Sequence, residues 1–146
     1  MKKYIDLVRE NRQKRKLNQI EPSRIIFFGG EPLLKKELII KCLEECWENF
    51  WWFTLISNGT IGWDKEFVDL CQSRWVDIQI SLDGNLKANN HRIFHNGKPM
   101  FFETYKTLQL LKNYTGKMVS SVVSEDNIDN IYESFCFLEK MGIDRV

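Results

Sequence analysis

The sequence predicts an α/β fold built on a parallel sheet, and three observations point to it. Short runs of β-favouring residues alternate with amphipathic helical patterns along the chain. Residues 25–28 are four consecutive apolar residues, which is typical of a strand covered on both faces, and they run directly into Gly29 and Gly30. The length of 146 residues suits one domain. Strands joined by helical crossovers are parallel, with right-handed connections.

The hydrophobic periodicity sets the order of the elements. In chain order we expect a helix over 4–17, a strand over 24–28, a helix over 33–50, a strand over 52–56, a helix over 64–71, a strand over 76–82, a polar loop over 85–99, a helix over 102–112, a strand over 117–123, a helix over 126–141 and a strand opening at 142–146. Ser23 is expected to cap the entry to the strand over 24–28.

Two of these elements carry a specific expectation about side-chain direction. In the helix over 33–50, the apolar stripe is expected to hold Leu38 and Leu43 together with Cys42 and Cys46. In the strand over 76–82, Ile78 and Ile80 share one face, while Gln79 and Ser81 share the other. Ser81 is therefore expected to point into a polar interior.

Composition limits the partners, the cellular location and the cysteine chemistry that we expect of the protein. The net charge is +1, so no overall field favours nucleic acid or an anionic membrane, and the basic run over 12–16 is expected to be a solvated helix face. The sequence shows neither a membrane span nor a signal peptide, which favours a cytoplasmic protein. All four cysteines fall in apolar helical patterns, so reduced thiols are expected.

Each predicted strand ends in a small polar cluster, and parallel strands bring these clusters to one edge of the sheet. We call residues 29–32, 57–60, 81–84 and 122–127 the rim clusters. Ligands of α/β proteins bind outside the carboxyl ends of the strands. Glu31 is expected to lie at this edge, and Pro32 suits the first turn of the helix that follows. The clusters together predict a site for a small molecule.

The same clusters, in the same order, resemble the landmarks of radical S-adenosylmethionine enzymes. The resemblance is to the branch that contains anaerobic sulfatase-maturating enzymes and peptide maturases with C-terminal auxiliary (SPASM) clusters. It runs from about residue 23 to the end of the chain and implies a partial (β/α)6 barrel. The first strand and the C-terminal helix of that barrel are missing here, so residues 1–146 are expected to be a single incomplete core domain. The missing strand leaves the strand over 24–28 exposed on one side and the domain prone to association.

The resemblance implies a set of residues that bind S-adenosylmethionine. Gly29, Gly30 and Glu31 correspond to the element that receives the methionine ammonium group, although an acidic residue also suits a helix N-terminus. Ser57 and Asn58 correspond to a polar pair near the ribose, but Asn58 before glycine is also an ordinary turn. The remaining expected cofactor-binding positions are Pro32, Ser81, Asp83 and Arg92. His91 and His95 flank Arg92 and are interpreted as solvated loop residues.

The chain departs from the family at the metal centre. The intact family binds a 4Fe-4S cluster through three cysteines spaced Cys-x3-Cys-x2-Cys, and no cysteine precedes Gly29 in this sequence. Cys42 and Cys46 have the first spacing, but they fall on an apolar helical stripe, which favours core packing. No metal ligand and no catalytic residue is therefore assigned. Ala88-Asn89 and Ser120 stand where relatives carry His-Asp and an arginine, which changes the expected cofactor contacts.

Two interpretations of function remain open. In the first, the chain is part of a radical S-adenosylmethionine enzyme acting on a peptide or protein and is inactive alone. In the second, it is a non-catalytic binding or interaction module whose exposed strand docks a partner that supplies the missing strand.

Overall fold

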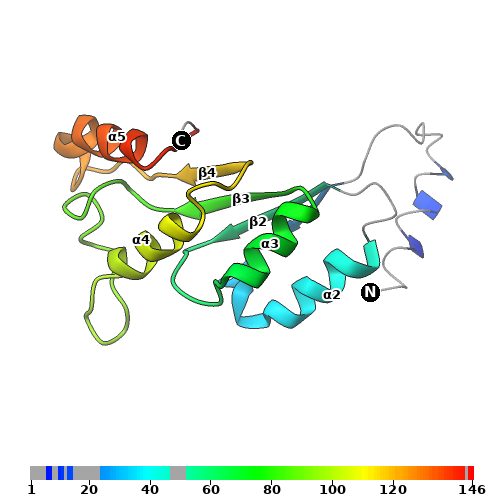
Figure 1. The fold of residues 1–146 in the computed structure, drawn as a ribbon. Coiled ribbons are helices and arrows are strands. Elements are labelled where there is room, and N and C mark those ends of the chain that lie inside the picture. Colours follow the sequence, from blue (N-terminus) through cyan, green and yellow to red (C-terminus); the bar gives the residue numbers. More distant parts are fainter. Residues whose placement is uncertain (1–5, 8–9, 12, 15–23, 47–51, 144) are drawn as a thin grey trace.

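A computed structural model describes residues 6–7, 10–11, 13–14, 24–46, 52–143 and 145–146. Its centre is a parallel sheet in the order β1-β2-β3-β4, formed by Arg24–Phe27, Trp52–Ser57, Val76–Ser81 and Lys117–Ser120. The helices between the strands are η1 (Pro32–Lys35) with α2 (Lys36–Cys46), α3 (Lys65–Ser73) and α4 (Phe101–Leu110), and η3 (Ile128–Asn130) with α5 (Ile131–Lys140) follows β4. Figure 1 shows α2, α3 and α4 on one side of the sheet. The predicted α/β fold with a parallel sheet is confirmed.

The two faces of the sheet differ in chemistry because side chains alternate along each strand. Val76, Ile78 and Ile80 of β3 are buried beneath the helices, whereas Gln79 and Ser81 are half-buried on the opposite face. Paired residues of parallel neighbours share a face, so Phe53, Leu55 and Val119 join the buried side. The prediction for the faces of this strand is confirmed.

The prediction that β1 is covered on both faces is wrong. β1 is an edge strand that pairs with β2 alone among the described residues. Ile25 and Phe27 pack against the core, while Ile26 is 51% exposed. The run of four apolar residues therefore reflects one face in the core and one face left open. The apolar stripe of α2 also needs a correction, since Leu38 is 57% exposed and Ile39 is buried with Cys42, Leu43 and Cys46.

The last predicted strands are shorter than expected. β4 ends at Ser120, because the N–H of Val122 donates to the Asp83 carboxylate instead of continuing the ladder. Residues 142–146 do not form a named strand in the described part, but the N–H of Val119 donates to the carbonyl of Arg145. Ser23 and residues 47–50 lie outside the described residues. Of the helix predicted over 4–17, the described residues are helical and the others lie outside.

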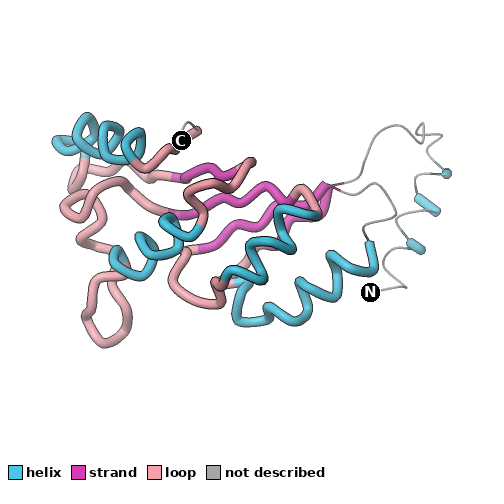
Figure 2. The backbone as a smooth tube through the Cα atoms, in the orientation of Figure 1, coloured by secondary structure: helices cyan, strands magenta, loops and turns pink. Residues whose placement is uncertain are grey.

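The loops after β3 and β4 lie at the same end of the sheet (Figure 2). This end carries the rim clusters. Within the described part of the chain, every helix is too short or too polar to cross a bilayer.

We expect Gly84→Ala to destabilise the domain more than Gly142→Ala does. Both glycines have positive φ, +122° and +71°, so alanine at either position costs about 1–2 kcal/mol of backbone strain. An added Cβ at Gly84 would lie 2.2 Å from Cβ of Ser134 in α5, whereas at Gly142 it meets no atom within 4 Å. Overpacking adds about 1–3 kcal/mol at Gly84. Urea unfolding of the two variants measures the difference, and equal losses would show that the loop after β3 does not pack on α5.

Candidate functional site

The carboxylate of Glu31 joins the ends of β1 and β2. Its Oε1 accepts hydrogen bonds from Ser57 Oγ at 3.0 Å and from the N–H of Leu33 at 3.1 Å, and its Oε2 accepts from the N–H of Asn58 at 2.9 Å. The bond from Leu33 makes Glu31 the N-cap of η1, which begins at Pro32. A carboxylate has about four acceptor positions, so these three bonds leave room for one further donor.

The loop after β2 is a tight turn locked onto α4. Asn58 Oδ1 accepts from both the N–H and the hydroxyl of Thr60, at 2.9 and 2.7 Å, which is the turn geometry considered from the sequence. Thr104 Oγ1 of α4 donates to the Asn58 carbonyl at 2.8 Å, and Thr107 Oγ1 donates to the Gly59 carbonyl at 2.7 Å. The side-chain oxygen of Asn58 is therefore already used within the chain.

Gly29 and Gly30 lie between the end of β1 and this carboxylate. A Cβ added at either glycine would meet no atom within 4 Å, so the backbone here borders open space. Gly29 has φ +153°, a conformation that favours glycine, whereas Gly30 has no positive φ. The carboxylate of Glu31, with its spare acceptor position, follows this open backbone directly in the chain, and a carboxylate suits an ammonium ligand.

Asp83 is the centre of a second network, at the ends of β3 and β4. Its carboxylate is fully buried and holds Arg92 in a bidentate pair, with Nε at 2.5 Å and Nη2 at 2.9 Å. It also accepts from the N–H of Val122 at 2.8 Å, and Nε2 of His91 lies 3.0 Å from it. Arg92, a predicted cofactor-binding position, thus holds a carboxylate of the chain itself in the fork geometry of a guanidinium.

The charge of Asp83 is stabilised by these partners. Burial alone raises the pKa of a carboxyl group, but the hydrogen bonds from Arg92 and Val122 and the positive charge of Arg92 outweigh it and lower the pKa of Asp83 below its usual value. Asn89 Oδ1 accepts from the N–H of Asp83 at 3.1 Å, which fixes the turn itself. Asp83 therefore shapes the loop after β3, and a direct contact with a cofactor stays a prediction.

Ser81 lies on the sheet face opposite the helices, two residues before Asp83. Its register partner across β3 and β4 is Ser120, so the two half-buried serines share that face. The structure thus brings Glu31, Ser57 and Asn58 together in one cluster and Asp83 with Arg92 in another. His91 was missed as a partner of Asp83, because nothing in the local sequence shows which loop side chain folds back onto a strand end.

Three of the four cysteines lie in the hydrophobic core. Cys42, Cys46 and Cys71 are buried beneath the helices, and Sγ of Cys42 lies 3.8 Å from Sγ of Cys46. Burial raises the pKa of Cys42 to about 12, with a contribution from Cys46, and burial likewise raises the pKa of Cys71 to about 12. The prediction that Cys42 and Cys46 pack in the core is confirmed by their burial.

Comparison with known proteins places this geometry in a known fold. No protein-family model matches the chain. Uncharacterized protein MJ0907 of Methanocaldococcus jannaschii is 29% identical over 133 residues, which cover 87% of this chain and 46% of that protein. This chain therefore spans about half the length of the curated relative that it matches.

Solved structures of anSMEcpe have the same fold. The structure of native anSMEcpe with bound AdoMet and Kp18Cys peptide matches with a TM-score of 0.75 and 19% identity, over 84% of this chain and 36% of that one. Native anSMEcpe with bound AdoMet matches with a TM-score of 0.76 and 21% identity, over 90% and 38%. The fold is thus a partial radical S-adenosylmethionine barrel, as the sequence predicted.

We expect Asp83→Asn to lower the free energy of unfolding by about 3 kcal/mol at pH 7, because it leaves a partly buried guanidinium without its counter-charge. Since the pKa of Asp83 is lowered in the folded state, its contribution is present above the unfolded pKa of about 3.9 and is lost as the pH falls below that value. Urea unfolding of wild type and variant from pH 7 to pH 3 measures this.

The matched control is Asp69→Asn, which removes an exposed carboxylate that pairs with Lys65 at 2.6 Å within α3. Exposed pairs contribute about 0–1 kcal/mol, so this variant should remain close to wild type. A loss at Asp83 no larger than at Asp69, or a difference that persists unchanged at pH 3, would contradict the role of Asp83.

Proposed function

We propose that this chain is the S-adenosylmethionine-binding part of a radical S-adenosylmethionine protein of the peptide-modifying kind. The observation that carries the proposal is the open Gly29-Gly30 backbone at the end of an edge strand, next to a carboxylate with one spare acceptor position. Such a group of oxygens suits the cofactor's ammonium group. The shared fold with AdoMet-bound anSMEcpe supports the same position.

Different residues have different parts in the proposed site. Gly29, Gly30 and Glu31 bind the ammonium group, and Ser81 offers a hydroxyl on the open sheet face. Pro32 begins η1 and fixes the capping geometry of Glu31. Four further residues shape the loops around the proposed site, and their direct contact with the cofactor stays a prediction: Ser57, Asn58, Asp83 and Arg92.

The proposed substrate is a peptide or protein, and two observations support it. The peptide bound to anSMEcpe supports a peptide or protein substrate for the whole protein. Among the described residues, β1 pairs with β2 alone, which favours a further strand from another segment or chain at its other edge. We propose a cytoplasmic setting, in line with reduced thiols.

We expect Gly30→Ala to weaken S-adenosylmethionine binding at least tenfold without changing stability. The added methyl group meets no atom of the chain within 4 Å and the backbone needs no positive φ, so the fold should tolerate it. A ligand that approaches the backbone at this position would meet the methyl group. Isothermal titration calorimetry gives the affinities, and thermal unfolding confirms that the variant folds.

Gly142→Ala is the control, because it also adds a methyl group in open space and lies outside the rim clusters. Absence of binding by the wild-type chain would refute the proposed function. Equal affinity of wild type and Gly30→Ala would show that the cofactor does not approach the backbone at this glycine.

We also expect the chain by itself not to release 5′-deoxyadenosine. Cys42, Cys46 and Cys71 lie in the hydrophobic core, and the described residues include no group of three or more cysteine, histidine or acidic side chains that could hold a metal ion. Anaerobic reconstitution with iron and sulfide, followed by chromatography of the nucleosides, tests this expectation. Cluster absorbance together with deoxyadenosine would contradict it.

A further inference from the structure

The outer side of η3 and α5 exposes apolar side chains that the fold does not use. On the inner side of α5, Leu138 is buried, and the ring of Phe137 lies 5.8 and 6.2 Å from the rings of Phe101 and Tyr105 in α4. Away from this contact, four large apolar side chains are exposed at spacings of three, four and seven residues, which makes them neighbours on a helix surface. They are Ile128, Ile131, Tyr132 and Phe135, at 53%, 37%, 77% and 49% exposure. A contiguous apolar surface of this kind is typical of an interaction site.

Carboxylates border these apolar side chains. Five acidic side chains lie in or beside η3 and α5, all of them exposed, and Lys140 is the one basic side chain between residues 124 and 141. The five are Glu125, Asp126, Asp129, Glu133 and Glu139. We call the four apolar and five acidic side chains together the α5 surface. An apolar centre with an acidic border favours a partner that is both apolar and basic.

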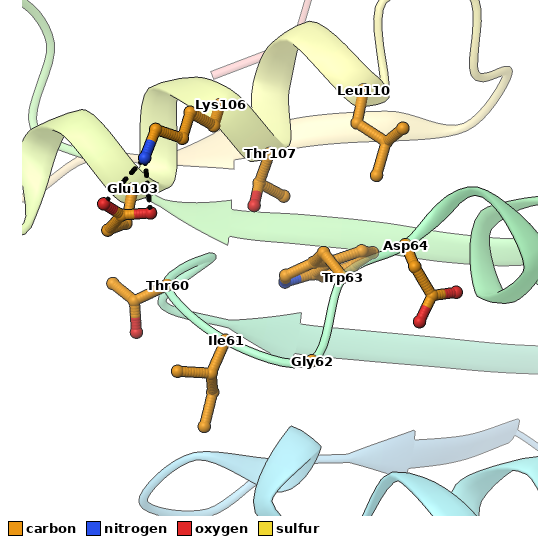
Figure 3. A pocket seen from close by; sticks show the side chains of 9 residues that line it. All are labelled: Thr60, Ile61, Gly62, Trp63, Asp64, Glu103, Lys106, Thr107 and Leu110. Carbon is orange, nitrogen blue, oxygen red and sulfur yellow. Dashed lines mark hydrogen bonds and ion pairs between the residues drawn. The ribbon is translucent and has the colours of Figure 1, made fainter.

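The carboxylates of the α5 surface differ from those of the other helices in their partners. One acidic residue on each of α2, α3 and α4 pairs with a lysine of the same helix: Glu45 with Lys41, Asp69 with Lys65, and Glu103 with Lys106 (Figure 3). None of the five carboxylates of the α5 surface has such a partner among the described residues. Their charge is therefore available to a second molecule.

Residues 2–17 have the chemistry that complements this surface. They include seven basic and two acidic side chains, interleaved with apolar residues such as Ile5, Leu7 and Val8. The whole chain has a net charge of +1 and this segment +5, so the remainder has −4. The described residues of the segment are helical and exposed, with Leu7 at 53%. Such a block of like charges is typical of an interaction segment.

The two complementary parts are far apart within one molecule. Figure 1 shows the described residues between 6 and 14 at one end of the molecule and α5 at the other. A contact between them therefore joins two copies of the chain. It uses unlike surfaces, so it either closes when both copies exchange their segments or continues from copy to copy.

We propose that the α5 surface binds residues 2–17 of a second copy of this chain. The apolar side chains of the segment pack on Ile131, Tyr132 and Phe135, and its lysines and arginines pair with the carboxylates of the border. This contact is separate from the free edge of β1 and does not depend on S-adenosylmethionine binding.

Light scattering of the full chain measures this association. We expect the average mass to rise with protein concentration at about 0.1 M NaCl and to return to that of a monomer at about 1 M, because the screening length falls from about 10 Å to about 3 Å. Apolar pairing through the edge of β1 would not weaken with salt. A mass that stays monomeric at every concentration, or association that salt leaves unchanged, would overturn the proposal.

Charge variants locate the contact on α5. Asp129→Asn combined with Glu133→Gln should weaken the association about tenfold. The matched control, Glu37→Gln combined with Glu44→Gln, removes the same charge from exposed positions of α2 and should leave it unchanged. All four positions are on the surface, and thermal unfolding confirms that both variants fold. Equal effects of the two double variants would place the contact elsewhere and overturn the assignment.

An aromatic variant tests the apolar part of the contact. Tyr132→Ala should weaken the association about tenfold, whereas Phe102→Ala, which removes a ring of 53% exposure from α4, should not. No effect of Tyr132→Ala would contradict packing on the apolar side chains.

A synthetic peptide identifies the segment that binds. Fluorescein-labelled peptide of residues 2–17 should bind the full chain saturably in an anisotropy titration. The same peptide with every lysine and arginine replaced by glutamine should bind at least tenfold more weakly, and so should the unchanged peptide with the Asp129→Asn, Glu133→Gln chain. A full chain that associates but does not bind the peptide would exclude residues 2–17 as the partner and overturn the proposal.

Discussion

The buried carboxylate of Asp83 is the interaction on which the rim of this sheet depends. It lies where β3 ends, and its partners come from the loop after β3 and from the segment after β4. A buried charge is tolerated only when it is paired and hydrogen-bonded, so Arg92 and the N–H of Val122 have to be in place for the strand end to be stable. The same bond to Val122 ends the β4 ladder, so one side chain sets the length of a strand, the course of a long loop and the entry to α5.

Glu31 does at β1 and β2 what Asp83 does at β3 and β4. In each case a carboxylate at the end of one strand accepts a backbone N–H from the segment that follows the neighbouring strand. In a parallel sheet, neighbouring strands end side by side, and the backbone N–H groups beyond the last ladder bond need another acceptor. The carboxylates of Glu31 and Asp83 are these acceptors. The rim is thus rigid at Glu31 and Asp83 and open at Gly29 and Gly30, which is the arrangement that a preformed ligand site needs.

The hydrophobic core and the strand ends carry different kinds of side chain. Cys42 and Cys46, which have the first spacing of the cluster motif, lie on the buried face of α2 with Ile39 and Leu43. The proposed cofactor site lies at the strand ends, outside this core.

Periodicity alone determined most of the secondary structure, the two faces of β3 and the burial of Cys42 and Cys46, because these depend on near neighbours in the chain. It predicted wrongly that both faces of β1 are covered, since an apolar run does not show what packs on each face. The position of β1 at the edge was expected from the missing first strand of the resembled barrel, and the sheet order agrees. Only the tertiary structure decided the partners of Glu31 and Asp83. The bonds from Ser57 and Val122 span 26 and 39 positions of the chain, and the register of the sheet brings them together. The same physical reason hid the contact of His91 with Asp83, because it forms only when the loop folds back onto the strand end.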